Sequence, residues 1–339
     1  MAGLGALMAA QPFAASSLGA AELARKSPRL KAGDTVGLIE PASASDGALD
    51  IQLVEEVVVA LGLKSKRGEH LLKRDGYLAG TDRERAADVN TMFADPDVRF
   101  ILAVRGGWGC ARMLPFLDWK VIRANPKLLM GYSDITALHM AIAARAGFIS
   151  LHGPNGGSAW GKASVESFKQ IAFEGSTPTF ANPVAGEDRL VQRKWRTEKI
   201  TGGKARGRLL GGNLTVLTAL AGTPYLPDFT GAILFIEDID EAEYRIDRML
   251  TQLGQAGVLK GLKGAVFGQC NNCVAPGPSG PSGFTLSEIL KHHLGGLGIP
   301  AYQGAFFGHM ADQFTIPVGA QAEIDADAGT IRLLESAVI

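Results

Sequence analysis

Short apolar runs alternate with amphipathic stretches over the first half of the chain. Four runs have the continuous apolar character of buried strands: residues 35–40, 99–104, 128–130 and 148–151. Three stretches have helical periodicity: residues 49–61, residues 82–93 and the segment from Ser133 to about Arg145. Strands that alternate with helices imply right-handed crossovers and a parallel sheet. The pattern therefore predicts an α/β domain over residues 31–155.

This alternation stops at residues 156–205, where Gly, Ser, Pro and charged residues are frequent. We interpret this stretch as a linker or crossover into a second domain over residues 206–339. Helices are predicted there after Gly211-Gly212-Asn213 and over 243–255, and strands over 232–236, 265–268, near 301, 314–317, 321–324 and 330–334. A length of 339 residues is consistent with two domains.

Charge excludes one class of partner. The 34 basic and 34 acidic side chains leave no formal net charge, so the chain lacks the electrostatic footprint of a nucleic-acid-binding protein. After the N-terminal segment no run reaches the roughly 18 consecutive apolar residues of a membrane-spanning helix. We therefore expect no nucleic-acid partner and no membrane span.

The N-terminal segment, residues 1–30, stands apart from the rest. Residues 2–24 carry no charge except Glu22 and are rich in Ala, Gly, Leu and Met, as in the apolar core and cleavage region of a secretory signal. The basic residues that open such a signal are missing, which fits a true start further upstream or a disordered or helical extension. We expect a periplasmic or exported protein if this segment is a signal peptide, and a cytoplasmic one otherwise.

Two predicted strands of the first domain end in unusual sequence, VRGGWG at 104–109 and GYSD at 131–134. Sites in parallel α/β sheets form at the carboxyl ends of strands, so both turns should share one edge. The N–H groups of Gly107 and Asp134 could form an oxyanion hole there. A phosphate-binding loop is the alternative, but the spacing is not G-x-G-x-x-G.

Ser133 lies on the turn between a strand and a helix, a suitable place for a nucleophile close to free N–H groups. Serine is also a preferred N-cap, so a purely structural role stays open. A nucleophilic serine needs a base. His139 lies about 120° around the helix from Ser133 and is expected to pack, whereas His152 and His309 could each face the site. Glu237 ends an apolar strand, or is a loop acid in an acidic run.

Several longer motifs point to a family. They are GYLAGTDRERAADVN (76–90), RGGWGCARMLPFLD (105–118), NPKLLMGYSDITALH (125–139), LHGP (151–154), GGNL (211–214), FIED with YRIDRML (235–250) and GHMADQFTIPVG (308–319). With these motifs in this order, the chain from about residue 33 to 333 resembles the LD-carboxypeptidase family of serine peptidases. That family includes murein tetrapeptide carboxypeptidases and microcin-immunity peptidases.

The resemblance implies a catalytic triad of Ser133, Glu237 and His309, with oxyanion donors at Gly107 and Asp134. It also implies an N-terminal parallel-sheet α/β domain and a C-terminal mixed α/β domain, with the site at their interface and no cofactor or metal. The family commonly has Asn where this chain has Gln313, a departure that concerns the local geometry around His309.

The implied reaction is hydrolysis of the L,D amide bond between a diamino acid and a terminal D-alanine in murein tetrapeptides, through an acyl-enzyme. Arg105 and Arg245 are candidates to bind the terminal carboxylate, although each could instead be a solvated or ion-paired arginine. The expected partners are a murein peptide and a second copy of the chain in a homodimer. Two alternatives stay open: a microcin-immunity-type amidase acting on aminoacyl-nucleotides, and a non-catalytic α/β protein that binds a nucleotide or sugar.

The spacing Cys270-Asn271-Asn272-Cys273 is shared by redox motifs and half zinc sites. There is no second pair, and Pro276-Gly277-Pro278 follows where a redox motif would open a helix. We expect a loop with free thiols or, in an exported protein, an incidental disulfide.

Overall fold

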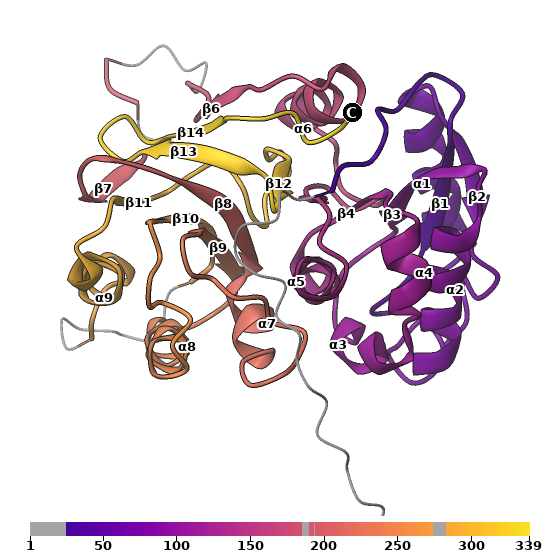
Figure 1. The fold of residues 1–339 in the computed structure, drawn as a ribbon, viewed down its shortest axis with the longest axis horizontal. Helices are drawn as coiled ribbons and strands as arrows, with labels where there is room; N and C mark the ends of the chain where they lie inside the picture. Colours follow the sequence, from indigo (N-terminus) through magenta and orange to yellow (C-terminus); the bar gives the residue numbers. More distant parts are fainter. Residues whose placement is uncertain (1–24, 185–189, 193, 274–282) are drawn as a thin grey trace, which may run out of the picture.

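The computed structural model describes residues 25–184, 190–192, 194–273 and 283–339. Figure 1 shows two sheet-containing domains side by side, with helix α5 (Thr136–Arg145) at their junction. The predicted two-domain α/β architecture is confirmed. The structure also shows where the two domains share parts of the chain.

The first sheet has six strands in the order β12-β5-β4-β3-β1-β2. Their bounds are β1 Thr35–Ile39, β2 Lys64–Arg67, β3 Val98–Ala103, β4 Leu128–Gly131, β5 Ser150–His152 and β12 Ile316–Val318. The five strands from the first half of the chain pair in parallel, which confirms the predicted parallel sheet, although β2 was not among the predicted strands. The sixth, β12, comes from the C-terminal part of the chain and pairs antiparallel with β5. Pro317 is tolerated in it because β12 is an edge strand.

The three predicted helices of the first domain, α1 Ala48–Ala60, α2 Asp82–Ala94 and α5, begin and end close to the predicted positions. The described chain also has two short helices there, α3 Cys110–Met113 and α4 Trp119–Ala124. Helix α2 begins at a capping box, in which the Thr81 side chain accepts from the Glu84 N–H and the Glu84 side chain accepts from the Thr81 N–H. Helix α5 is almost entirely buried because it packs against α7 and β8 of the second domain as well as against its own sheet.

The second sheet has eight strands in the order β6-β14-β13-β8-β9-β10-β11-β7. Their bounds are β6 Thr179–Ala181, β7 Glu198–Thr201, β8 Lys204–Asn213, β9 Ile233–Ile239, β10 Gly264–Asn271, β11 Ala301–Gln303, β13 Gln321–Asp325 and β14 Thr330–Leu333. Strands β8, β9, β10 and β11 are parallel, and the remaining strands pair antiparallel. The sheet is therefore mixed, as the family resemblance implied.

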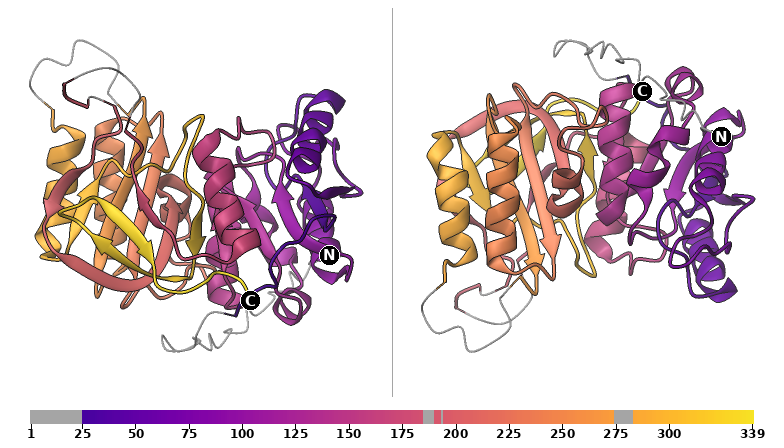
Figure 2. Two further views of the ribbon diagram at one scale, coloured as in Figure 1. Left: turned by 90° about the horizontal axis from the view of Figure 1, so that it is seen from above. Right: turned by 90° about the horizontal axis from the view of Figure 1, so that it is seen from below.

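Three helices accompany this sheet: α7 Leu214–Ala219, α8 Glu243–Gln255 and α9 Leu286–His293. Helices α8 and α9 lie side by side (Figure 2). Helix α8 buries Ile246, Met249, Leu250 and Leu253, which are spaced along one helical face. The stretch 156–205 is more than a crossover, since it contains α6 (Lys162–Lys169) and also supplies β6 and β7 to the second sheet.

Residues 25–30 of the signal-like segment lie against the first domain, while residues 1–24 lie outside the described residues. The Arg25 N–H donates to the Gly147 carbonyl at 2.9 Å, and Ser27 pairs with Val338 near the C-terminus. Leu30 is buried. The folded part of the chain thus includes residues from Arg25 onward. Within the part of the chain that the structure describes, no helix is both long and apolar enough to cross a membrane.

Candidate active site

Ser133 lies two residues after the end of β4 and is the first residue of a short 3-10 turn, Ser133–Ile135, that leads into α5. Its backbone φ is +65°, a left-handed conformation that is uncommon for residues other than glycine and that concentrates at functional sites. The N-cap of the turn is Tyr132, and no side chain caps it. Among the described residues the Ser133 hydroxyl has no hydrogen-bond partner. The interpretation of Ser133 as a helix cap is therefore wrong.

The glycine-rich loop after β3 lies directly against the Ser133 turn. A Cβ atom at Gly106 would lie 2.9 Å from Ser133 Cβ, so only glycine allows this approach. Gly107 has a φ of +115°, and a Cβ there would lie 2.2 Å from Ser43 Oγ. The same Ser43 hydroxyl accepts a hydrogen bond from the Trp108 N–H at 3.1 Å. The backbone of the loop is thus held between the side chains of Ser133 and Ser43.

The carboxylate of Asp134 ties the serine turn to the start of α3. Its Oδ2 accepts a hydrogen bond from the Cys110 N–H at 2.7 Å, and the side chain is fully buried. Burial raises the pKa of Asp134 above its ordinary value, although hydrogen bonds from Cys110 oppose that shift. The side chain of Asp134 therefore positions the loop, which leaves its backbone N–H for a separate role.

A buried arginine joins the loops that follow β1 and β3. Arg85 lies on α2 with its guanidinium enclosed, and its Nη1 donates to the carbonyls of Pro41 at 2.6 Å and Gly109 at 2.8 Å. Its Nη2 pairs with Asp82. A buried charge is tolerable only when it is paired and hydrogen-bonded, and Arg85 meets that condition.

The second domain supplies an acid and a base that contact each other. Glu237 lies in β9 and is fully buried, and His309 lies on the segment between β11 and β12. His309 Nδ1 donates to Glu237 Oε2 at 2.7 Å, because a carboxylate can only accept. Burial opposes the charged imidazolium, but the hydrogen bond and the charge of Glu237 outweigh it, with help from Asp238 and Asp240. The pKa of His309 therefore lies above its ordinary value.

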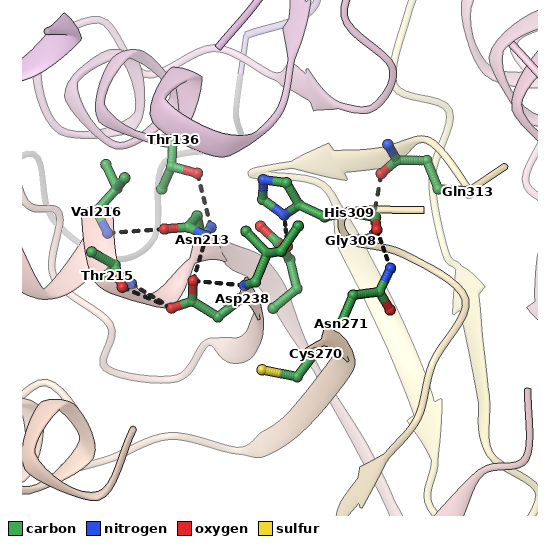
Figure 3. Close-up of polar contacts among 12 residues, drawn as sticks. Thr136, Asn213, Thr215, Val216, Asp238, Cys270, Asn271, Gly308, His309 and Gln313 are labelled. Carbon is green, nitrogen blue, oxygen red and sulfur yellow. Dashed lines mark hydrogen bonds and ion pairs between the residues drawn. The ribbon is translucent and has the colours of Figure 1, made fainter. Parts of the chain in front are cut away.

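Neighbouring side chains hold the backbone around His309 in place. Gly308 has a φ of +125°, and a Cβ there would lie 3.1 Å from Glu237 Oε2, so a side chain would crowd the pair. The Asn271 side chain donates to the His309 carbonyl. Gln313 is buried, and its Oε1 accepts from the Gly308 N–H at 3.4 Å (Figure 3). Gln313 therefore keeps a contact to the histidine loop at the position where the family commonly has Asn.

A polar network links the serine turn to the acid across the domain junction (Figure 3). The Asn213 N–H donates to Thr136 Oγ1, one turn after Ser133, at 2.9 Å, and Asn213 Nδ2 donates to Asp238 Oδ1 at 3.0 Å. Asp238 is the neighbour of Glu237 and also accepts from Thr215. Burial and the Glu237 charge raise the pKa of Asp238 to about 6. The network fixes β8 and β9 relative to α5.

One pocket of about 430 Å³ brings most of the predicted site together. Ser133, Gly107, Arg105 and His309 all line it. The ring of Tyr132 meets the His309 ring edge to face, with centroids 4.9 Å apart. Arg245 does not line this pocket. It lies on α8 with half of its side chain exposed, 3.6 Å from Glu241 and beside the Tyr244 ring.

The structure distinguishes His309 from the two buried histidines near the serine turn, His139 and His152. His139 is buried and bonded through Nδ1 to Ser150 and through Nε2 to the Gly131 carbonyl, each at 2.8 Å, so it packs as expected. Burial lowers the pKa of His139 to about 4. His152 is sealed among aromatic rings, and neither ring nitrogen has a hydrogen-bond partner in the described chain. Of the two candidates, His309 alone lines the pocket.

Among the pocket residues that sequence reasoning missed are three with polar side chains, Asp50, Tyr132 and Asn155. Asn155 Oδ1 accepts from the Tyr132 N–H at 3.2 Å and so supports the serine turn. Tyr132 could have been found from its place beside Ser133. Asp50 gave no signal in the sequence, because an acid in the first turn of a helix is an ordinary feature.

Cys270 and Cys273 form a disulfide, which was one of the two expectations for this motif. The disulfide encloses Asn271, the residue that bonds the His309 carbonyl. Cys110 is a free, buried thiol. In the described residues no group of three or more His, Cys, Asp or Glu side chains is arranged to hold a metal ion.

Family models match both halves of the chain. Residues 36–153 match the LD-carboxypeptidase N-terminal domain, and residues 206–324 match the LD-carboxypeptidase C-terminal domain. These ranges contain every residue of the Ser133 turn, the glycine-rich loop and the Glu237–His309 pair.

Relatives and solved structures match over most of their length. A probable murein peptide carboxypeptidase of Bacillus subtilis is 39% identical over 306 residues, which are 88% of this chain and 91% of the relative. The structure of the microcin C7 self immunity protein MccF superposes with a TM-score of 0.82 at 28% identity and covers 93% of this chain and all of that one. A muramoyltetrapeptide carboxypeptidase from Oxalobacter formigenes gives 0.76 at 30% identity, over 88% of this chain and 97% of that one.

Proposed function

Because the chain belongs to the LD-carboxypeptidase family, we propose that it is a serine carboxypeptidase that releases terminal D-alanine from murein tetrapeptides. The bond cleaved is the L,D amide between a diamino acid and D-alanine. The observation that carries the proposal is the pocket itself: a serine with left-handed backbone faces the same 430 Å³ space as a histidine bonded to a buried glutamate.

In the proposed mechanism His309 is the general base. Its Nδ1 proton is engaged by Glu237, which leaves Nε2 free to take the proton from the Ser133 hydroxyl. The serine oxygen then attacks the amide carbonyl. The imidazolium that forms is stabilised by Glu237, the same contact that raises the pKa of His309. His309 next protonates the departing D-alanine amine, and water hydrolyses the acyl-enzyme.

The oxyanion of the tetrahedral intermediate is assigned to the N–H groups of Gly107 and Asp134. Gly107 is in the glycine-rich loop that abuts Ser133, and Asp134 is the next residue along the chain. Each such donor is worth about 3–4 kcal/mol in the transition state. The Asp134 carboxylate is engaged by the Cys110 N–H, so the role proposed for Asp134 in the oxyanion hole falls to its backbone N–H.

Arg105 is the better of the two arginine candidates for the terminal carboxylate. It lines the pocket, and its Nη1 donates a hydrogen bond to the Ala44 carbonyl at 3.0 Å. The other N–H groups of its guanidinium remain for a ligand. Arg245 does not line the pocket, so the structure does not support it as a ligand of the terminal carboxylate.

The decisive experiment incubates the protein with a murein tetrapeptide and follows D-alanine by mass spectrometry. Release of D-alanine supports the proposal. Absence of release, together with cleavage of an aminoacyl sulfamoyl adenosine, would favour the second candidate, a microcin-immunity-type amidase. That candidate is kept because the MccF structure superposes closely over nearly the whole chain. A non-catalytic binding protein would show neither reaction.

Export and dimer formation remain predictions. A disulfide persists in oxidising compartments such as the periplasm, so the Cys270–Cys273 bond is consistent with export. N-terminal sequencing of the protein from a periplasmic fraction tests cleavage of the first residues. Light scattering during gel filtration tests the homodimer.

A further inference from the structure

Helix α1 forms one wall of the pocket and contributes a negatively charged residue, Asp50, to the lining that also contains Arg105. Asp50, Leu53 and Val54 all line the pocket, and their spacing of three and four residues places them on one helical face. Val54 is fully buried, whereas Leu53 is half exposed. This face therefore offers an apolar surface with a carboxylate at the N-terminal end of the helix.

The carboxylate of Asp50 has no cationic partner among the described residues. Its Oδ2 accepts a hydrogen bond from the Asp46 N–H at 2.8 Å, and within the same part of the chain Oδ1 has no partner. Arg105 lines the same pocket and likewise makes no ion pair within the described chain, since its one hydrogen bond goes to the Ala44 carbonyl. The pocket thus presents one anion and one cation that do not neutralise each other.

Two unpaired opposite charges in one pocket suit a ligand that carries both signs. With Arg105 holding the terminal carboxylate, a cationic group of the substrate remains for Asp50. The neighbouring Leu53 and Val54 suit the methylene chain that leads to such a group, because long amines lay their apolar stems along apolar surface. The volume of about 430 Å³ lies within the range of about 300–1,000 Å³ for small-molecule sites.

We propose that Asp50 is a specificity residue that binds the side-chain ammonium group of the residue preceding the scissile bond. This inference rests on the proposed carboxypeptidase function and adds to it the residue that would recognise the side-chain amine of the diamino acid. Asp50 takes no part in the chemical step. It selects the substrate and aligns the acyl side of the amide with Ser133.

The test uses three synthetic tetrapeptides that differ only at the third residue: L-lysine, Nε-acetyl-lysine and Nε-succinyl-lysine. We expect the unmodified protein to cleave the lysine peptide with a kcat/KM about 10-fold higher than the acetylated peptide. In Asp50→Asn, which keeps an oxygen acceptor for the Asp46 N–H, the ratio should fall to near one. Asp50→Lys should instead favour the succinylated peptide over the lysine peptide.

Asp46→Asn is the matched control. Asp46 is exposed near the same end of α1 and does not line the pocket. Its replacement by Asn removes the same unit of negative charge as Asp50→Asn. It should keep the full preference for the lysine peptide, which excludes a general effect of net charge. Thermal unfolding by circular dichroism shows whether each variant folds, and the reversed preference of Asp50→Lys does not depend on the behaviour of Asp50→Asn.

The outcomes separate this inference from the proposed function. Release of D-alanine at equal rates from all three peptides would overturn the role of Asp50 and leave the carboxypeptidase assignment intact. That role would also be overturned if Asp50→Asn kept the preference of the unmodified protein. Failure to cleave any of the peptides would refute the proposed function, and the inference would fall with it.

Discussion

The two halves of the candidate site are built in different ways. The half around Ser133 is held mainly by backbone geometry, namely a left-handed serine and two glycines in close contact with neighbouring residues. One side chain, the Asp134 carboxylate bonded to the start of α3, supports it. The half around His309 is held by side chains that carry charge, above all the Glu237–His309 hydrogen bond of 2.7 Å between segments 72 residues apart.

This difference predicts how each half fails. Steric changes should disable the serine half at every pH, because the close contacts that Gly106 and Gly107 make do not depend on charge. Charge changes should disable the histidine half in a pH-dependent manner, because the pKa of His309 depends on Glu237. Substitutions in each half probe that distinction, beginning with the largest effect.

Ser133→Ala should lower turnover by roughly 10³-fold or more while the protein stays folded, because the nucleophile is lost and only binding and the oxyanion donors remain. Kinetics of D-alanine release and thermal unfolding measure the two quantities. Ser158→Ala, a second serine that lines the pocket, is the matched control and should reduce turnover by less than about 10-fold. Activity surviving in Ser133→Ala would remove the serine half from the mechanism.

Glu237→Gln should reduce kcat by roughly 10²- to 10⁴-fold, because the amide neither fixes the same tautomer nor stabilises the imidazolium as a carboxylate does. The loss should come with a lower pKa of His309, measured by NMR titration of the ring protons. Asp240→Asn, which removes a weaker and more distant charge, should shift that pKa in the same direction by less. An unchanged pKa in Glu237→Gln would contradict the charge-based account of this half.

Gly107→Ala should lower kcat by about 10²-fold, the effect of losing one oxyanion donor. Its φ of +115° and the 2.2 Å approach to Ser43 Oγ force the loop to move. The backbone strain amounts to about 1–3 kcal/mol. The pH profile of the remaining activity should match that of the unmodified protein, since His309 is untouched. A shifted profile would mean that the two halves are not separable.

The unmodified enzyme should lose kcat/KM by about 10-fold per pH unit below the raised pKa of His309, because the base must be neutral. Stability runs the other way. A folded pKa above the unfolded one, as for His309 and for Asp238 at about 6, favours the folded state at low pH, and that contribution is lost as pH rises through the folded pKa. Urea unfolding and initial rates across the same pH range check both trends.

The smallest effect is expected from the disulfide. Replacing Cys270 and Cys273 with serine should lower the free energy of unfolding by about 2 kcal/mol or less, since the closed loop is very short. Activity should fall only a few-fold, through the Asn271 contact to the His309 carbonyl. Urea denaturation and D-alanine release measure these changes. A loss as large as that of Glu237→Gln would show that the redox state of this turn controls the histidine half.

The sequence predicted the serine half better than the histidine half, for a physical reason. The glycine-rich loop and Ser133 follow two strands of one parallel sheet, and periodicity alone places them at the same edge. The pairing of Glu237 with His309 is a contact between distant segments, and no local pattern encodes it. Only the family resemblance named the pair, while reasoning from residues left His152 and His309 equal.

Other features depend on tertiary context that short-range pattern cannot supply. The positive φ of Ser133 could not be predicted, because serine before a helix is more typical of an N-cap. The sequence also could not show that Arg245, a candidate for the terminal carboxylate, lies on the exposed side of α8. The strand β12 has three residues, too few to reveal which sheet it joins. Only the three-dimensional structure shows that β12 pairs with β5.

The crossing of β12 into the first sheet has a consequence for synthesis on the ribosome. Residues 316–318 complete the edge beside β5, and Val338 pairs with Ser27, so the first domain cannot acquire all its native partners until nearly the whole chain has been translated. The emerging N-terminal half must meanwhile keep an unpaired strand edge, which is a hazard for aggregation. Completion of that edge also draws the segment carrying His309 toward Ser133, so maturation of the fold and assembly of the site become a single late event.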